Sequence, residues 1–182
     1  MSDEIVALYD PSDAEGRVTG TAPRSRVRRE NLPHAATVVV IVDRDARVLV
    51  HRRSERKDLW PGLLDCASGG VVLAGEAFES AARRELAEEV GIDDAGLALE
   101  FLLRDWYRDD LTWYLASVYR AGWDGPVRFV DGEVAEAWWA APEAVAAALA
   151  DPTSPFVPDT RSLLGRLPCP ISVAKSGYPE PG

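Results

Sequence analysis

Blocks of apolar residues alternate with polar turns along the chain, and most of the blocks have the length and composition of β-strands. A continuous β-branched run at 36–42 is followed by a short polar turn and a second apolar run, which predicts two strands about a turn. Two longer blocks meet at Asp109 and Asp110 and predict another such pair. The predicted strands cover residues 4–9, 36–42, 47–52, 63–72, 97–110, 111–121 and 133–140.

The segment 77–90 has apolar residues at helical spacing instead, and Gly91 follows it where a helix C-terminus favours positive φ. The stripe that we expect to face the core consists of Phe78, Ala82, Leu86 and Val90. Further helices are predicted at 25–33, 142–150 and 156–167. Because strands and helices alternate irregularly with hairpins between them, the pattern predicts an α/β fold, a mixed sheet with helices on both faces.

Length and composition fit one globular domain, since the chain has 182 residues and 47% hydrophobic content. The sequence contains no apolar run of about 18 residues and no basic, apolar leader, so neither a membrane helix nor a signal peptide is expected. Cys66 and Cys169 are expected to be free thiols in a reducing cytoplasm. The protein is therefore expected to be cytoplasmic, with no membrane partner.

The net charge of −10 argues against nucleic acid as a partner, because a nucleic-acid binder shows a basic footprint. It is compatible with a small anionic substrate, because a bound divalent cation reverses the local field. The charge balance is therefore compatible with a small phosphorylated ligand.

Three glutamates crowd one turn of the predicted 77–90 helix. Glu85, Glu88 and Glu89 are three or four residues apart and share a face, where like charges cost roughly 0.2 to 0.5 kcal/mol per pair. A solvated face with Arg83 and Arg84 as partners would tolerate that cost. Clustered carboxylates also make a site for a hard cation, and Mg²⁺ prefers oxygen ligands.

The residues around these glutamates resemble the signature of the Nudix family. That signature is Gly, five residues, Glu, seven residues, then Arg-Glu-aliphatic-any-Glu-Glu-any-Gly-aliphatic. The chain matches it at every specified position: Gly70, Glu76, Arg84, Glu85, Leu86, Glu88, Glu89, Gly91 and Ile92.

The resemblance implies a Nudix-type α/β/α sandwich with a mixed β-sheet. It implies a single domain over residues 1–167, with an N-terminal strand and hairpin extension at 1–33 and the Nudix box at 70–92. The Pro/Gly-rich segment 168–182 is expected to be a flexible tail. The implied activity is that of a pyrophosphohydrolase, which cleaves the phosphoanhydride bond of a small diphosphate such as a nucleoside diphosphate derivative.

The resemblance also implies roles for individual residues. Glu85 and Glu89 resemble the principal ligands of Mg²⁺, for which Mn²⁺ can substitute. Glu88 resembles a third ligand, and Arg84 resembles the arginine that fixes the glutamates by salt bridges. The carbonyl group of Gly69 matches a frequent backbone ligand.

Hydrolysis also requires a general base, for which the sequence offers several carboxylates. We favour Glu133 as the catalytic base, and the alternatives are Glu136, Asp109 and Asp110. For each of these four, an ordinary solvated carboxylate is the default interpretation. Glu76 has two interpretations, a part of the Nudix signature or a favourable charge near a helix N-terminus.

Basic residues at the end of the predicted strand 47–52 and in the loop after it are candidates for binding the substrate phosphates, because guanidinium groups bind phosphate in bidentate fashion. Arg52 and Arg53 end a strand that should point toward the site, and we expect one of them to reach it. Lys57 follows in the next loop and is the third candidate.

Over about residues 4–165 the chain is similar to the Nudix branch of type 1 isopentenyl-diphosphate isomerase. That similarity is carried by His34, Lys57 and Trp60-Pro61-Gly62. Aligned on this turn, the isomerase's catalytic cysteine falls at Gly69 and its metal-binding histidine at Val71, whereas Cys66 lies too early. An isomerase-like enzyme and a non-catalytic nucleotide-sensing module stay as alternatives to the hydrolase, and both a monomer and a homodimer are compatible with the sequence.

Overall fold

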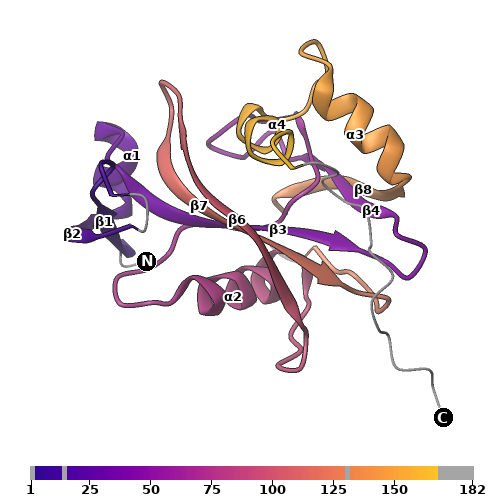
Figure 1. Cartoon of the computed structure of the whole chain (residues 1–182), viewed down its shortest axis with the longest axis horizontal. Coiled ribbons are helices and arrows are strands. Elements are labelled where there is room, and N and C mark those ends of the chain that lie inside the picture. The colour runs from indigo at the N-terminus through magenta and orange to yellow at the C-terminus, as the bar shows by residue number, and fades with distance from the viewer. Residues whose placement is uncertain (1–2, 14–15, 130–131, 168–182) are drawn as a thin grey trace.

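The fold is organised around the strand β3 (His34–Val42), which is buried along its whole length. A strand that is apolar on both faces belongs in the middle of a sheet covered on both sides. The computed structural model describes residues 3–13, 16–129 and 132–167, and it places β3 at the centre of the molecule (Figure 1). The predicted flexible tail at 168–182 lies outside the described residues.

The sheet is mixed, as the sequence predicts, because one parallel strand pair joins several antiparallel ones. Parallel pairing runs between β3 and β7, from His34 opposite Tyr114 to Val42 opposite Gly122. All other pairs of named strands are antiparallel, including β6 with β7 and β4 with both β5 and β8. The strands besides β3 are β1 (Ile5–Tyr9), β2 (Val18–Pro23), β4 (Val48–Arg53), β5 (Leu64–Asp65), β6 (Leu99–Arg108), β7 (Trp113–Gly122) and β8 (Val134–Ala140).

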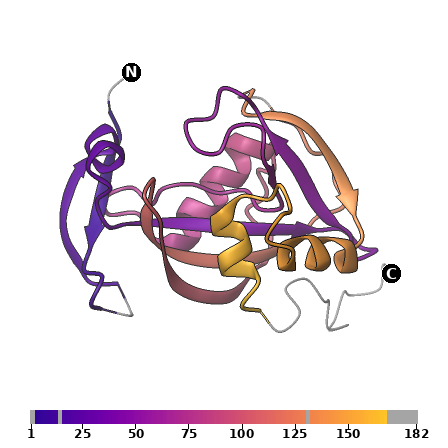
Figure 2. The same cartoon turned by 90° about the horizontal axis from the view of Figure 1, so that it is seen from above.

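Helices cover both faces of this sheet, which confirms the expected three-layer sandwich (Figures 1 and 2). On one face, α2 (Phe78–Val90) packs its apolar stripe against Val39 and Ile41. On the other face, α3 (Pro142–Ala150) and α4 (Pro158–Leu164) pack against Val38 and Val40. The two-residue alternation of a β-strand thus divides β3 between two cores.

The N-terminal extension forms a separate small layer at one end of the sheet (Figure 2). The strands β1 and β2 form an antiparallel hairpin, and α1 (Arg24–Glu30) packs against it through Val27. That small core also includes Val71, from the loop at the start of the Nudix box. The extension is therefore fixed against the loop that carries the candidate site.

The helix α2 ends as the sequence predicts. Gly91 adopts a φ of 69°, and its N–H bonds the carbonyl of Leu86. The predicted core stripe is confirmed, since Ala82, Leu86 and Val90 are buried and Phe78 packs against them.

One predicted element is much shorter than expected. The strand predicted at 63–72 is regular only at Leu64 and Asp65. The rest of the segment is a loop that runs alongside β3 and pairs with it only at isolated residues. The N–H of Thr37 donates to Gly70, at 2.9 Å, and that of Val39 donates to Ser68, at 2.7 Å. The glycine pair at 69–70 interrupts regular pairing here, since glycine weakens a strand interior.

Cys66 is a buried free thiol, as expected, while Cys169 lies outside the described residues. Among the described helices, none combines the length and the apolar composition that crossing a membrane requires.

Candidate active site

A cavity of about 310 Å³ opens between α2, β3, β4 and the N-terminal extension. The Nudix-box glutamates form one wall of this cavity. Basic side chains from α1, from β4 and from the following loop line other parts of it, and two aspartates lie at its floor. The charged residues that line the cavity are Glu4, Arg24, Arg28, Arg53, Lys57, Asp65, Arg84, Glu85, Glu88, Glu89, Glu133 and Asp159.

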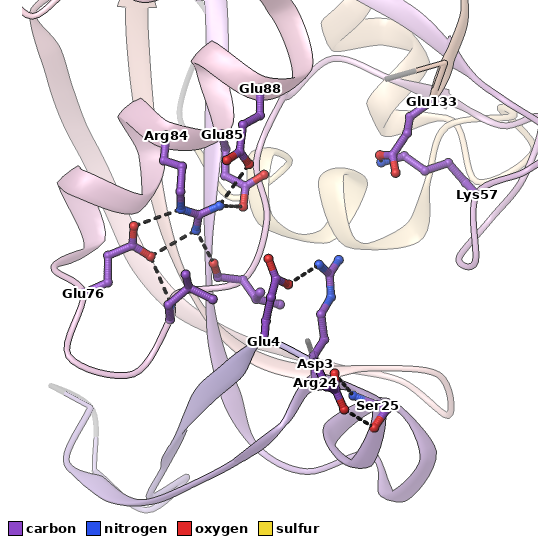
Figure 3. A network of polar contacts seen from close by, with 12 residues as sticks. Asp3, Glu4, Arg24, Ser25, Lys57, Glu76, Arg84, Glu85, Glu88 and Glu133 are labelled. Carbon is purple, nitrogen blue, oxygen red and sulfur yellow. Dashed lines mark hydrogen bonds and ion pairs between the residues drawn. The ribbon is translucent and has the colours of Figure 1, made fainter. Parts of the chain in front are cut away.

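Arg84 is the centre of the acidic wall (Figure 3). Its Nε and Nη2 each donate to one oxygen of Glu76, at 3.0 Å, and its Nη1 donates to Glu85 at 2.6 Å and to Glu88 at 3.2 Å. Nη2 also donates to the carbonyl of Val71, at 2.9 Å. These bonds hold the pKa of the Arg84 guanidinium above its ordinary value, with the Glu76 contact as the largest cause.

Glu76 therefore has a structural role that neither interpretation of the sequence described. Besides its two bonds to Arg84, it accepts the N–H of Leu73 at 3.0 Å. Its carboxylate connects the loop after the glycine pair to the guanidinium that holds the other glutamates. The length of the Gly70-to-Glu76 spacing in the signature is what permits this return contact.

Glu85 is nearly fully buried, with 9% of its surface exposed. Desolvation by that burial raises the pKa of its carboxyl to about 7, and the nearby Glu89 and Glu88 add to the shift against the opposing effect of Arg84. Gly70 makes this placement possible, because a Cβ at that position would lie 2.5 Å from Glu85 Oε1. The glycine is required by close approach of the carboxylate to the backbone.

Glu89 lies one turn further along the same helix face, and desolvation raises the pKa of its carboxyl. It accepts the N–H of Gly69 at 3.0 Å, and Lys57 Nζ lies 3.3 Å from its Oε1. The same Lys57 amine contacts the carboxylate of Glu133. Glu133, our candidate base, is thus linked through one cation to a predicted metal ligand.

Within the described part of the chain, no three His, Cys, Asp or Glu side chains are gathered into a ready metal-binding cluster. The ion pairs explain this arrangement. Arg84 draws Glu85 and Glu88 to one side of α2, and Lys57 draws Glu89 toward the opposite wall. Cation binding to all three glutamates would require these pairs to rearrange.

The two adjacent arginines at the end of β4 lie on different sides. Arg53 faces the cavity, where its Nε and Nη2 donate to the carbonyl of Leu59 at 3.2 and 2.9 Å. Arg52 is not among the cavity-lining residues, and its Nε donates to Glu136 at 2.7 Å. A bulge in the pairing of β4 with β8 falls between these two arginines. The expectation that one of them reaches the site therefore favours Arg53.

The alternative bases lie elsewhere, since none of the three lines the cavity. Glu136 is paired with Arg52. Asp109 accepts the phenol of Tyr107 at 2.9 Å and two backbone N–H groups of the turn between β6 and β7, a turn that also contains Asp110. Of the four carboxylates considered, Glu133 has the position that a base would need.

The floor of the cavity contains a buried acidic pair that the sequence analysis did not identify. Asp159 accepts the phenol of Tyr114 at 2.7 Å, and Asp65 accepts the hydroxyl of Thr160 at 2.8 Å. Desolvation, with Asp65 next, raises the pKa of Asp159 to about 7. Asp159 belongs to the segment Phe-Val-Pro-Asp-Thr at 156–160. It reaches the cavity only because α4 packs against the sheet.

The residues related to isomerase chemistry are also placed by the fold. His34 is buried, its Nδ1 lies 2.9 Å from the carbonyl of Leu32, and burial lowers its pKa to about 4. Cys66 is fully buried, which raises the pKa of its thiol and keeps it protonated. An exposed, acidic cysteine is what covalent or proton-transfer chemistry needs.

A sequence model of the NUDIX domain matches residues 32–160. An uncharacterized Nudix hydrolase of Rhodococcus erythropolis, orf19, is 40% identical over 172 residues, covering 90% of this chain and 91% of that protein. The uncharacterized Nudix hydrolase YfcD of Escherichia coli K12 is 34% identical, covering 85% and 83% respectively. The crystal structure of DR0079 from Deinococcus radiodurans superposes with a TM-score of 0.73 at 25% identity, covering 90% of this chain and 99% of that one.

The fold and the complete signature thus agree with the sequence comparisons. The chain belongs to the Nudix family, and it is an enzyme of that family's pyrophosphohydrolase class. The expectation of a Nudix-type α/β sandwich is confirmed.

Proposed function

We propose that this chain is a Mg²⁺-dependent Nudix hydrolase that cleaves the phosphoanhydride bond of a small diphosphate, such as a nucleoside diphosphate derivative. The observation that carries the proposal is the shared cavity of the Nudix-box carboxylates and the cations Arg53 and Lys57. Carboxylates suit a hard metal ion, and the cations suit phosphate oxygens.

The donor set fits a divalent cation. Glu85 and Glu89 are carboxylates whose negative charge is disfavoured by burial, and a bound cation would offset that cost. The hydroxyl oxygen of Thr37, buried and without a hydrogen-bond partner among the described residues, lines the same cavity. Glu85, Glu88 and Glu89 would hold the ion, with the carbonyl of Gly69 as the predicted backbone ligand. When bound, magnesium supplies Lewis-acid polarisation of the phosphoryl group and lowers the pKa of the attacking water.

The protein side chains divide the remaining tasks. Arg84 orients Glu85 and Glu88, and Glu76 holds Arg84 in place. Lys57 and Arg53 bind phosphate oxygens, and contact of Lys57 with substrate would release Glu89. Glu133 accepts the proton of the attacking water.

Isomerisation and ligand sensing are less well supported. Cys66 is buried, and residues with no ionisable side chain, Gly69 and Val71, stand where the isomerase has its cysteine and histidine. The chain keeps the metal-ligand glutamates Glu85, Glu88 and Glu89, which a purely sensing module does not need.

The direct test is a substrate panel with Mg²⁺, comprising nucleotide sugars, dinucleoside polyphosphates, nucleoside triphosphates and isopentenyl diphosphate. Release of phosphate, pyrophosphate or nucleoside monophosphate identifies hydrolysis, and proton exchange on isopentenyl diphosphate identifies isomerisation. We expect hydrolysis of at least one nucleotide substrate and no proton exchange.

The matched variant is Glu89→Gln, which keeps side-chain size but removes the negative charge. We expect kcat on the best substrate to fall by at least about a hundredfold and Mn²⁺ affinity, measured by electron paramagnetic resonance, to fall with it. Glu79→Gln is the control, because Glu79 lies on the same helix but outside the cavity, paired with Arg83. Near-normal turnover of Glu89→Gln at saturating Mg²⁺ would contradict the assignment of Glu89 as a metal ligand.

A further inference from the structure

The N-terminal extension supplies part of the catalytic cavity. Arg24 and Arg28 of α1 both line it, although they precede residue 32, where the match to the NUDIX-domain model begins. Residues four apart share a helix face, so one side of α1 presents two guanidinium groups to the cavity. Four of the seven residues of α1 are arginine, in a chain whose net charge is −10. The helix α1 thus forms a basic wall of the cavity, the α1 wall, with Glu4 beside it, on a protein whose net charge is negative.

Most cations that line the cavity already have an oxygen partner. Arg24 donates to Glu4 at 2.6 Å (Figure 3). Arg53 donates to the carbonyl of Leu59, and its Nη1 lies 3.6 Å from Oδ2 of Asp65. Lys57 is paired with Glu89 and Glu133. These pairs leave each charge compensated in the absence of substrate.

Arg28 is different. Its Nη1 is buried and has no hydrogen-bond partner among residues 3–13, 16–129 and 132–167. Desolvation by burial, followed by repulsion from Arg24, lowers the pKa of the Arg28 guanidinium; the attraction of Asp58 opposes this shift, and repulsion from Arg53 adds to it. A buried N–H without an acceptor is costly for a fold, and Arg28 lines the cavity that we propose takes an anionic substrate.

We propose that Arg28 binds a phosphate group of the substrate beyond the scissile phosphoanhydride linkage, so that the enzyme selects substrates with a third phosphate over those that end in an uncharged sugar. This inference rests on the proposed hydrolase function. Phosphate is the ligand because the planar guanidinium offers paired N–H donors that match its oxygens. The diphosphate itself is assigned to the metal ligands, Arg53 and Lys57, which leaves the α1 wall for an additional anion.

The kinetic test compares two substrates with the same base, a nucleoside triphosphate and a nucleoside diphosphate sugar, in the presence of Mg²⁺. For Arg28→Gln we expect kcat/KM on the triphosphate to fall about ten- to hundredfold, mainly through KM, as the loss of a charge-assisted hydrogen bond implies. We expect less than about a threefold change on the sugar. The control is Arg29→Gln, because Arg29 lies on the same helix, is exposed, does not line the cavity and pairs with Glu30. Arg28→Lys should recover part of the loss, since it keeps the charge but not the paired donors.

A second measurement is independent of turnover. Calorimetric titration of the magnesium-free protein with inorganic tripolyphosphate should show at least about tenfold weaker binding for Arg28→Gln than for the wild type or Arg29→Gln. The melting temperature of Arg28→Gln should be unchanged or raised, because the substitution removes an N–H that the fold leaves unsatisfied. A structural arginine would behave in the opposite way, with a lowered melting temperature.

The outcomes separate this inference from the proposed function. Equal losses on both substrates, or unchanged tripolyphosphate affinity in Arg28→Gln, would overturn the role of Arg28 even if hydrolysis is observed. If the wild type hydrolyses no substrate of the panel but binds tripolyphosphate through Arg28, the hydrolase proposal fails while the anion site stands.

Discussion

Arg84 on α2 and Arg28 on α1 line the same cavity, yet their guanidinium groups are held in different ways. Arg84 donates to three carboxylates and one carbonyl, all within the Nudix box or the loop that leads into it. Arg28 keeps a buried N–H without a described acceptor. A charge whose partners are all present in the folded chain stabilises the site, whereas a charge with a missing partner is available to a ligand.

The two walls also differ in how the cost of burial is met. On α2 the desolvation of Glu85 is opposed by Arg84, which is bonded to it directly. On α1 the charges of Arg24 and Arg53 have the same sign as that of Arg28 and add to its cost, and the attraction of Asp58 opposes it only in part. The comparison predicts that substitutions on the α2 wall reduce stability and that those on the α1 wall reduce substrate selection.

The largest expected effect follows from removal of Arg84. In Arg84→Gln, the buried carboxylate of Glu85 and the half-buried carboxylate of Glu76 lose their counter-charge, and breaking such a network costs about 3–5 kcal/mol of the free energy of unfolding. Urea denaturation at pH 7 measures this value. Arg83→Gln is the control, because the exposed pair of Arg83 with Glu79 contributes about 0–1 kcal/mol. Similar losses in the two variants would mean that the Arg84 network is no more than a surface feature.

The sequence was most informative where the physical cause is local. The periodic stripe of α2, the αL glycine at its end and the long apolar strands each follow from spacing and propensity, and the structure confirms them. The nine-position signature likewise brought Arg84 and the three glutamates together, since they lie within two turns of one helix. Each of these features is determined within about 20 residues of sequence.

The parts that could not be predicted depend on contacts between distant segments. Asp159 reaches the cavity because α4 packs across the sheet face, and Arg28 reaches it because the hairpin β1–β2 sets α1 beside the Nudix loop. The pattern RSRVRRE gave a basic helix but no sign of which arginine turns inward. Strand alternation predicts that Arg52 and Arg53 point to opposite faces, but which of the two faces the cavity depends on the pairing of β4 with β5 and β8.

The buried aspartates of the cavity offer a second test of how the cost of burial is met. The carboxylate of Asp159 is buried next to Asp65, which has the same charge. Its pKa of about 7 in the folded chain exceeds the ordinary value of 3.8. The folded state therefore holds the proton more tightly, and this contribution to stability is present below pH 4 and is lost as the pH rises through 7. The slope is at most about 1.4 kcal/mol per pH unit.

The variant Asp159→Asn removes this titration. We expect the difference in unfolding free energy between variant and wild type to shift in favour of the variant by about 1–3 kcal/mol from pH 5 to pH 7. His34 and Glu85 titrate in both proteins, so their effects cancel in the difference. Asp151→Asn is the control, because hydrogen bonds from Thr153 hold the pKa of Asp151 below its usual range and outside this window. A pH-independent difference for Asp159→Asn would show that the carboxylate is already ionised at pH 5.

The smallest effects are expected for the neighbouring arginines at the end of β4. One of them is paired within the fold and the other faces the cavity, as with Arg84 and Arg28. Arg52 forms an exposed ion pair with Glu136, so Arg52→Gln should change KM by less than about twofold and the free energy of unfolding by less than about 1 kcal/mol. Arg53 faces the cavity, so Arg53→Gln should raise KM about tenfold, the effect of losing one interaction with phosphate. Steady-state kinetics on the preferred substrate measures both. Because Arg53 also donates to Leu59, a lowered melting temperature with unchanged KM would instead assign Arg53 to the loop after β4 and leave substrate binding to Arg28 and Lys57.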